Sequence, residues 1–523
     1  MTVTLPAQAP ASSAPQRPRP WRQAARLLRM EIRHSAFVWC LPLLIVLFIY
    51  DPYRTAAGYA VLWPVRSTVV LNKFWPDMVV FAAGFSAWAG SREGRRNVGD
   101  LLATTARPAW TRQLCALAGT AFWVVAAFLA GVVALYVQTA TQATWGGPPI
   151  APVVVGVLGL LAVCAVAFTL GALFPGRFTA PIVAVALMII TLYAFRQAVG
   201  DNGGSTGAIG VLSPDGSVPG NDWGLFYPVS IGVPLVQAGF MAGLVLAAIG
   251  VLGLSARTGG AGWRGGLSAV AAGGARLRAI AGSAVAVGVA LVVAAFALAG
   301  TANVADSTST LQIPAIDNAL AGSKPIPYTP VCSSAGSFPV CLHPAFRDYL
   351  PQVTSALAAV VTELAGLPGT PVRAVEVPQG ALPPVVAEGN GDGQVKGGVY
   401  EFSLSNADAP GTDPSLLRGS LQQDIVHAVI IGSPGTVATT TAPDGNKSTS
   451  RQPDNGSTAQ QAVEDGLLQA LGSRPFPAVG PQQNEVAQAA AKFAALPAAT
   501  RHAWLVAHLA ALRAGTITVA QLP

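Results

Sequence analysis

The stretch REGRRNVGDLLATTARPAWTR, residues 92–112, is a charged island between two apolar segments and carries five arginines. Four of its residues follow the i, i+3, i+4, i+7 spacing of one helix face: Val98, Leu101, Leu102 and Thr105. Asn97 can cap this helix, and Pro108 ends it at or before Arg107. The pattern predicts a short amphipathic helix between two membrane spans, suited to docking onto a soluble partner. A solvated basic loop that only sets membrane topology is the alternative.

On both sides of this island, apolar runs fill the first 300 residues. Hydropathy predicts about seven membrane-spanning helices, at 35–50, 76–91, 113–138, 152–174, 180–198, 229–254 and 279–300. The first two are shorter than the roughly 20 residues that a bilayer core needs. Pro76 is expected to begin the second span. The preceding segment 56–71 is also apolar, and we expect it to be interfacial or re-entrant, with a break at Pro64.

The distribution of basic residues predicts the orientation. With the N-terminus inside, 16 of the 20 Lys and Arg residues of 1–301 fall on the inner side and four on the outer side. This positive-inside pattern predicts a multi-pass plasma-membrane protein with a cytoplasmic N-terminus and an extracytoplasmic C-terminal domain. The predicted spans contain almost no ionisable groups, which argues against coupling to protons or sodium ions.

Composition divides the chain near residue 301. The whole chain is 52% hydrophobic and 11% charged; residues 1–301 carry 20 basic and 8 acidic residues, and residues 302–523 carry 11 and 16. The basic excess therefore follows membrane topology. Since the tail has no basic patch interleaved with aromatic residues, nucleic acid is not an expected partner.

The N-terminal segments have distinct patterns. Residues 1–20 are rich in Pro, Ala, Ser and Gln and are expected to form a disordered cytosolic lead, with no signal peptide. In 21–34, arginines alternate with apolar residues, which predicts a basic amphipathic helix along the inner membrane face. The cytosolic end of the first span is the alternative.

Beyond the spans, the sequence predicts a small α+β domain at 331–523, joined by a Ser/Thr/Pro-rich linker at 302–330. Strands are expected at 371–377 and 398–404. Helices are expected at 351–366, 415–431, 458–472, 483–495 and 498–514. The low-complexity stretch 433–457 is expected to be a mobile loop.

Of the five cysteines, Cys332 and Cys341 lie nine residues apart in the tail. In an extracytoplasmic domain this pair predicts a disulfide, because the spacing does not match a zinc site. The other three lie in apolar spans, where a free thiol behaves as a small hydrophobic group.

No catalytic or metal site is predicted in this chain. It contains no Gly-x-x-x-x-Gly-Lys-Ser/Thr sequence, so it is not expected to hydrolyse ATP. His427 follows Gln423 and Asp424 on an expected helix, where a zinc peptidase has His-Glu-x-x-His. A single imidazole binds zinc poorly, so we interpret this helix as structural.

The island 92–112 resembles the first cytoplasmic loop of type-2 ABC exporter permeases. Six residues match the order of that loop: Glu93, Gly99, Leu101, Leu102, Pro108 and Arg112. The resemblance implies a coupling helix seated on a separate ATPase, and it makes 21–34 similar to the family's elbow helix. A six-span core is usual in the family, whereas here a seventh predicted span exports a tail.

The tail shows a weaker resemblance. Cys341-Leu342-His343-Pro344, together with the Trp504–Gly515 pattern, resembles permease-like proteins of high-GC Gram-positive (actinobacterial) species. Some related permeases carry gluzincin peptidase domains, of which 423–427 could be a degenerate remnant.

The sequence therefore predicts a non-enzymatic membrane subunit of an ATP-driven exporter, working in the bilayer as a homodimer or with a second permease. ATP and magnesium would belong to the ATPase partner. The expected coupling residues are Glu93, Arg95, Arg96, Val98, Leu101, Leu102, Arg107, Pro108 and Arg112. A membrane-anchored outer binding or sensing domain without transport is the second hypothesis, and a degenerate zincin-like outer domain is the third.

Overall fold

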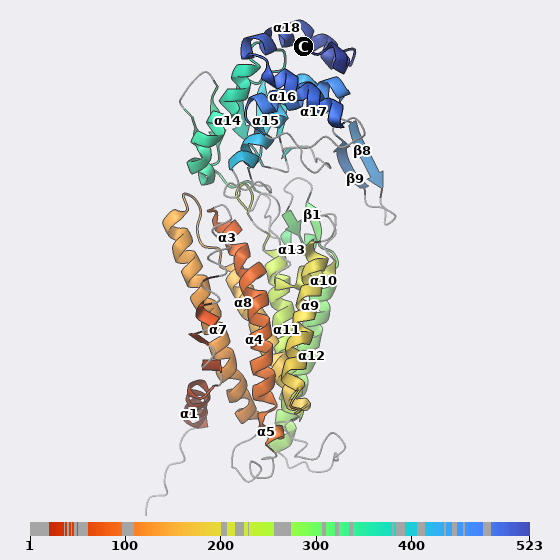
Figure 1. Cartoon of the computed structure of the whole chain (residues 1–523). Coiled ribbons are helices and arrows are strands. Elements are labelled where there is room, and N and C mark those ends of the chain that lie inside the picture. The colour runs from red at the N-terminus through yellow and green to blue at the C-terminus, as the bar shows by residue number, and fades with distance from the viewer. Residues whose placement is uncertain are drawn as a thin grey trace, which may run out of the picture.

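A computed structural model gives the structure of the protein. It describes residues 20–35, 61–96, 109–199, 207–214, 224–228, 230–255, 273–305, 310–318, 324–333, 338–378, 381–382, 393–404, 414–432, 436–441, 447–452, 456–473 and 483–523, and part of 37–50. The chain is mostly helical, with a long helical bundle at one end and a mixed domain at the other (Figure 1).

Four helices of the described chain are long and apolar enough to cross a membrane. They are α7 (Ala109–Gln142), α8 (Ala151–Leu173), α11 (Gly232–Ser255) and the Arg278–Ala299 part of α12 (Gly273–Ala299). They match four of the predicted spans. Helix α9 (Thr179–Val199) contains a shorter apolar stretch, Thr179–Ala194. The predicted span 35–50 is described only in part, and its described residues from Phe37 onward are helical.

The second predicted span belongs to a longer helical run than expected. Helix α3 (Trp63–Val69), the π-helix η1 (Val70–Phe74) and α4 (Trp75–Gly90) follow one another without interruption. Helix α3 begins at Trp63, directly before Pro64, where a proline in the first turn of a helix loses no intrahelical hydrogen bond. Residues 56–60 of the segment expected to break at Pro64 lie outside the described residues. Pro76 does not begin the helix. Its ring would clash with the carbonyl of residue 72 in a regular α-helix, and the wider π turn just before it relieves that clash.

Glycines allow two pairs of bundle helices to approach closely. A Cβ atom on Gly90 or Gly171 would collide with the backbone of the facing helix, so α4 and α8 meet nearly backbone to backbone. Helices α11 and α12 cross in the same way at Gly243 and Gly288. Small residues at such crossings are typical of helix packing in membranes.

The segment predicted as a linker is packed onto the bundle where it is described. It contains the hairpin of β1 (Asn303–Ala305) and β2 (Thr310–Gln312), followed by α13 (Pro314–Asp317). The Asp317 carboxylate accepts hydrogen bonds from the Gly232 N–H at 3.0 Å and from the Ser230 hydroxyl at 2.7 Å. Because Gly232 begins α11, this carboxylate stabilises the positive end of that helix dipole.

The C-terminal domain is built on a mixed five-stranded sheet in the order β3-β4-β5-β7-β6. The strands are β3 (Val331–Cys332), β4 (Val340–Leu342), β5 (Arg373–Glu376), β6 (Gly393–Lys396) and β7 (Val399–Phe402). Neighbours β4 and β5, and β5 and β7, are parallel, whereas the two edge pairs are antiparallel. Strands β5 and β7 match the two predicted strands.

Helices accompany this sheet and form the far end of the molecule (Figure 1). They are η3 (Pro344–Tyr349), α14 (Leu350–Glu363), α15 (Pro414–Ile430), α16 (Thr458–Ala470), α17 (Gln483–Ala495), α18 (Ala498–Arg513) and η5 (Val519–Gln521). Within the range predicted as a loop, 433–457, strands β8 (Thr436–Thr441) and β9 (Lys447–Gln452) pair as an antiparallel hairpin. Threonine-rich alternation favours strands, which corrects the expectation of a loop throughout this range.

The core of the C-terminal domain continues into the bundle. It includes Leu62 and Val65 at the start of the α3–α4 run, and Leu225 and Phe226 from the segment before α11. These residues are between 1% and 4% exposed, and they pack with buried residues of β4 and α14 such as Val340 and Val353. The tail and this end of the bundle therefore share one hydrophobic core.

Candidate functional site

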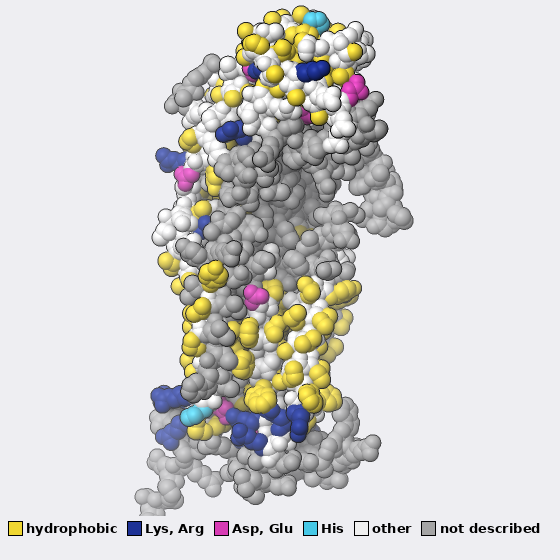
Figure 2. All heavy atoms as spheres, in the orientation of Figure 1, with side chains coloured by type: hydrophobic (Ala, Val, Ile, Leu, Met, Phe, Trp, Pro, Cys, Tyr) yellow, Lys and Arg dark blue, Asp and Glu magenta, His cyan; other side chains and the backbone are white. Residues whose placement is uncertain are grey.

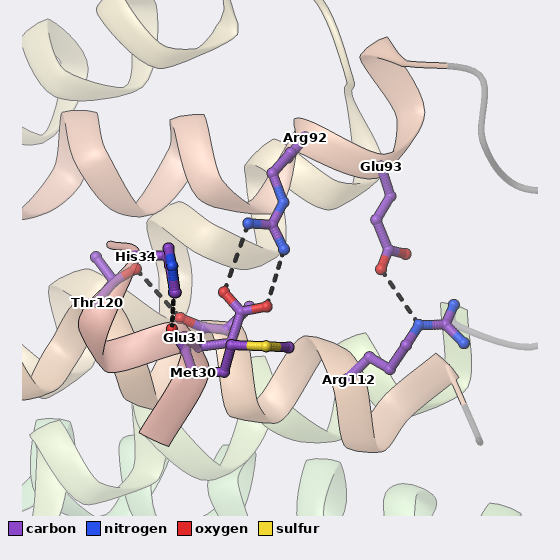
Figure 3. A network of polar contacts seen from close by, with 8 residues as sticks. Met30, Glu31, His34, Arg92, Glu93, Arg112 and Thr120 are labelled. Carbon is purple, nitrogen blue, oxygen red and sulfur yellow. Dashed lines mark hydrogen bonds and ion pairs between the residues drawn. The ribbon is translucent and has the colours of Figure 1, made fainter. Parts of the chain in front are cut away.

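The candidate site is the corner where α1 (Pro20–Arg33), α5 (Arg92–Arg95) and the start of α7 meet (Figure 3). It lies at the end of the bundle opposite the C-terminal domain (Figure 1). Lys and Arg side chains gather at this end, while hydrophobic side chains cover much of the bundle above it (Figure 2). The corner contains the described part of the predicted coupling stretch.

One ion pair joins α1 to α5. The Arg92 guanidinium donates hydrogen bonds to both Glu31 carboxylate oxygens, at 3.0 and 3.5 Å (Figure 3). The Arg92 side chain is 43% exposed and that of Glu31 is 19% exposed. Such a partly exposed pair contributes about 1 kcal/mol or less, so it selects the position of α1 more than it stabilises the fold.

A second ion pair joins α5 to α7. The Arg112 Nε donates to Glu93 Oε1 at 3.5 Å, which brings together the two ends of the 92–112 stretch (Figure 3). Arg95 turns back onto α4, where its guanidinium lies 3.5 Å from the centre of the Trp88 ring and donates to the Trp88 carbonyl. Of the expected coupling residues, Glu93 and Arg112 therefore hold the corner, whereas Arg96 is exposed to solvent.

Helix α1 packs along the first turns of α7. The two helices run in the same direction, because residue numbers rise together along their contacts. Cys115 lies against the Ala24 carbonyl, and the Trp123 indole donates to the Ile32 carbonyl at 2.7 Å. Between these contacts, Gly119 leaves room for the backbone of Glu31. The Ile32 carbonyl belongs to the last turn of α1, where carbonyls lack intrahelical partners, so Trp123 satisfies the end of this helix.

The corner also touches the connection between α8 and α9. A Cβ atom on Gly94 would collide with the ring of Pro175, so α5 packs closely on this connection. Five expected coupling residues lie outside the described residues, and nothing tests their role: Val98, Leu101, Leu102, Arg107 and Pro108.

Sequence reasoning did not include Glu31 or Trp88 in the site. Glu31 is the single acidic residue of the basic segment 21–34, and a lone carboxylate among arginines could have indicated an ion pair with a basic residue elsewhere in the chain. Its partner, Arg92, is 61 residues away in the chain. Trp88 enters the site through the Arg95 guanidinium, which lies over its ring.

At the opposite end, the structure joins Cys332 and Cys341 by a disulfide across β3 and β4, as predicted from the sequence. Next to it, the fully buried ring of His343 lies 4.4–5.1 Å, between centroids, from the rings of Tyr328, Trp145 and Phe226. Two of these residues come from bundle connections, so His343 marks the contact between tail and bundle. Burial lowers the pKa of His343 to about 4, which keeps its imidazole neutral at pH 7.

The helix considered for a peptidase remnant is α15. His427 Nδ1 lies 3.2 Å from a carboxylate oxygen of Glu464 on α16. The Asp424 carboxylate accepts a hydrogen bond from the Tyr400 hydroxyl at 2.7 Å. Across the described ranges, no group of three or more His, Cys, Asp or Glu side chains is placed to hold a metal ion. These contacts give His427 and Asp424 structural roles in the packing of α15.

The chain matches no protein-family model, no curated protein and no solved structure.

Proposed function

We propose that this protein is the membrane subunit of an ATP-driven exporter and that its 92–112 stretch receives a separate ATPase subunit. The observation that carries the proposal is the corner itself. Glu93 and Arg112 clamp the two ends of the stretch, and Arg92 ties it to α1. The stretch follows α4 and leads into α7, so a segment held at both ends in this way can pass a partner's movement to these two helices.

In this proposal the bundle has seven spans. Three further spans join the four long apolar helices: the predicted span 35–50, the continuous run Trp63–Gly90, and α9. The basic corner would lie in the cytosol and the disulfide-bonded domain outside the cell. The gathering of Lys and Arg at the corner supports this orientation (Figure 2). A homodimer or a second permease would complete the translocation path.

A membrane-anchored outer domain that binds or senses a ligand, without transport, is the second candidate. The core that the tail shares with Leu62, Val65 and Phe226 favours it, because a domain fixed in this way can transmit a binding event to the bundle. It predicts that no ATPase subunit accompanies the protein.

Affinity purification of the intact protein from its native membranes tests the proposal. The test variant is Arg96→Glu/Leu101→Asp/Leu102→Asp, which spares Arg95 because that residue stacks on Trp88. We expect it to recover at least about tenfold less ATPase subunit than the wild type, since hot-spot losses cost 2 kcal/mol or more. The matched control is Arg373→Glu/Val372→Asp/Val506→Asp, three exposed positions of the outer domain. The ATPase subunit is identified by mass spectrometry through its nucleotide-binding motif.

Equal recovery by wild type and test variant would overturn the coupling role of 92–112. Absence of any ATPase from all three preparations would favour the anchored outer domain.

A further inference from the structure

An apolar groove runs between α1 and the start of α7. It encloses about 500 Å³ and is lined from α1 by Ala24, Ala25 and Leu28, and from α7 by Trp110, Leu114 and Ala118, among others. This volume is in the range of about 300–1,000 Å³ found for small-molecule sites. Glu31, which pairs with Arg92, lies at helical spacing from Ala24 and Leu28, so the groove adjoins the corner along this face of α1.

The α7 wall of the groove continues into a surface that faces away from the bundle. Leu114 and Ala118 are followed, at helical spacing, by Phe122, Leu129 and Val133. The last three are between 38% and 59% exposed, and Ala118 is exposed as well. Since α7 is long and apolar enough to cross a membrane, this stripe is suited to contact lipid tails. The groove is thus open to the hydrocarbon along one continuous apolar face.

The α1 wall carries positive charge at its edge. Ala25 is exposed, and Arg29 lies one helical turn further on the same face. Arg26 and Arg33 are also exposed, and none of these three arginines has an ion-pair partner within the described ranges. The acidic residue of this helix, Glu31, is already paired with Arg92. A ligand that bridges the two walls would therefore combine an apolar chain with an anionic head.

We propose that this groove binds one acyl chain of an anionic phospholipid, whose phosphate lies on Arg26 and Arg29. The lipid comes from the membrane leaflet on the side of α1 and α5. It would fix α1 against α7 and so set the position of Glu31, which holds the corner through Arg92. The proposal does not depend on the protein's being an exporter.

Native mass spectrometry of the full-length protein in non-ionic detergent tests the site. Phosphatidylglycerol and phosphatidylcholine with identical acyl chains are titrated separately. We expect the wild type to retain one phosphatidylglycerol at concentrations where phosphatidylcholine is not retained. Arg26→Gln/Arg29→Gln should weaken phosphatidylglycerol binding roughly tenfold or more, because each cation near an anionic lipid contributes about 1 kcal/mol.

The filling variant is Ala118→Trp, which places a ring in the groove from an exposed position. It should abolish retention of the single lipid, whereas Ala186→Trp, at an exposed position of α9, should retain it as the wild type does. Unfolding temperatures of the four proteins control for folding. Unchanged retention by Ala118→Trp, equal retention of the two lipids by the wild type, or no retained lipid at all would each overturn the proposal.

Discussion

Asp465 is the residue whose burial has the clearest consequence for the stability of the C-terminal domain. It lies on α16 beside Glu464, and the pKa of its carboxyl is raised from 3.8 to about 7 by desolvation, and further by the neighbouring negative charge. Between pH 4 and pH 7 the folded chain therefore holds a proton that the unfolded chain has lost. Stability from this group falls as the pH rises through that window.

The substitution Asp465→Asn should remove this dependence. We expect it to raise the free energy of unfolding at pH 8 by about 1–2 kcal/mol, a value discounted for partial solvent exposure, and to have no effect below pH 4. Thermal unfolding of the full-length protein at both pH values measures this difference. Asp348→Asn, at an exposed carboxylate, should behave as the wild type at both. An equal effect of Asp465→Asn at pH 4 and pH 8 would contradict the assignment.

At the scale of elements, the glycine contact between α4 and α8 is the most demanding helix crossing of the bundle core. A Cβ atom on Gly171 would meet the carbonyl oxygen of Ala87 on α4. Neither backbone can move away easily, because both helices pack on other helices of the same core, including α7 through Phe128. The crossing thus depends on the absence of a side chain at this position.

We expect Gly171→Ala to lower the free energy of unfolding by about 1–3 kcal/mol, the usual cost of overpacking. The same substitution at Gly282 of α12, where no atom lies within 4 Å of an added Cβ, should be neutral or stabilise the protein by up to about 1 kcal/mol through helix propensity. Thermal unfolding of both variants in the same detergent shows whether the free energy of unfolding falls for Gly171→Ala and stays equal or rises for Gly282→Ala. A Gly171→Ala protein as stable as the Gly282→Ala protein would show that the α4–α8 crossing is adaptable.

Periodic elements could be predicted from the sequence, and elements that depend on distant partners could not. Helices α14 and α18 have long apolar stripes and match their predicted ranges closely. The run through Pro76 was missed, because the π turn that accommodates the proline has no sequence signature. At the candidate site, the resemblance of the 92–112 stretch to a coupling loop drew attention to Glu93 and Arg112, and their coupling role stays a prediction. The Glu31–Arg92 pair could not be predicted, because it forms only when α1 packs on α7.

For the whole molecule, the position of the C-terminal domain follows from the aromatic cluster around His343. Phe226 is 2% exposed, and its ring centroid lies 5.1 Å from that of His343 and 5.6 Å from that of Tyr328. Its carbonyl also accepts a hydrogen bond from the Ile326 N–H at 2.7 Å. The same core holds Val65 at the start of the α3–α4 run, which ends beside the α5 corner. The C-terminal domain and the corner therefore lie at opposite ends of one continuous helical run.

Phe226→Ala should weaken the contact between the C-terminal domain and the bundle without unfolding the bundle. Truncation of a fully packed phenylalanine costs about 3–5 kcal/mol, and here the loss falls on the contact between the two parts. We expect faster amide hydrogen exchange in 324–330, 338–346 and 62–66, and unchanged exchange in α8. Phe122→Ala is the matched control, because that ring is 49% exposed on α7 and should leave all three segments protected. If amide protons of 338–346 stay protected in Phe226→Ala, contacts other than the aromatic cluster hold the C-terminal domain on the bundle, and the proposed role of the cluster is wrong.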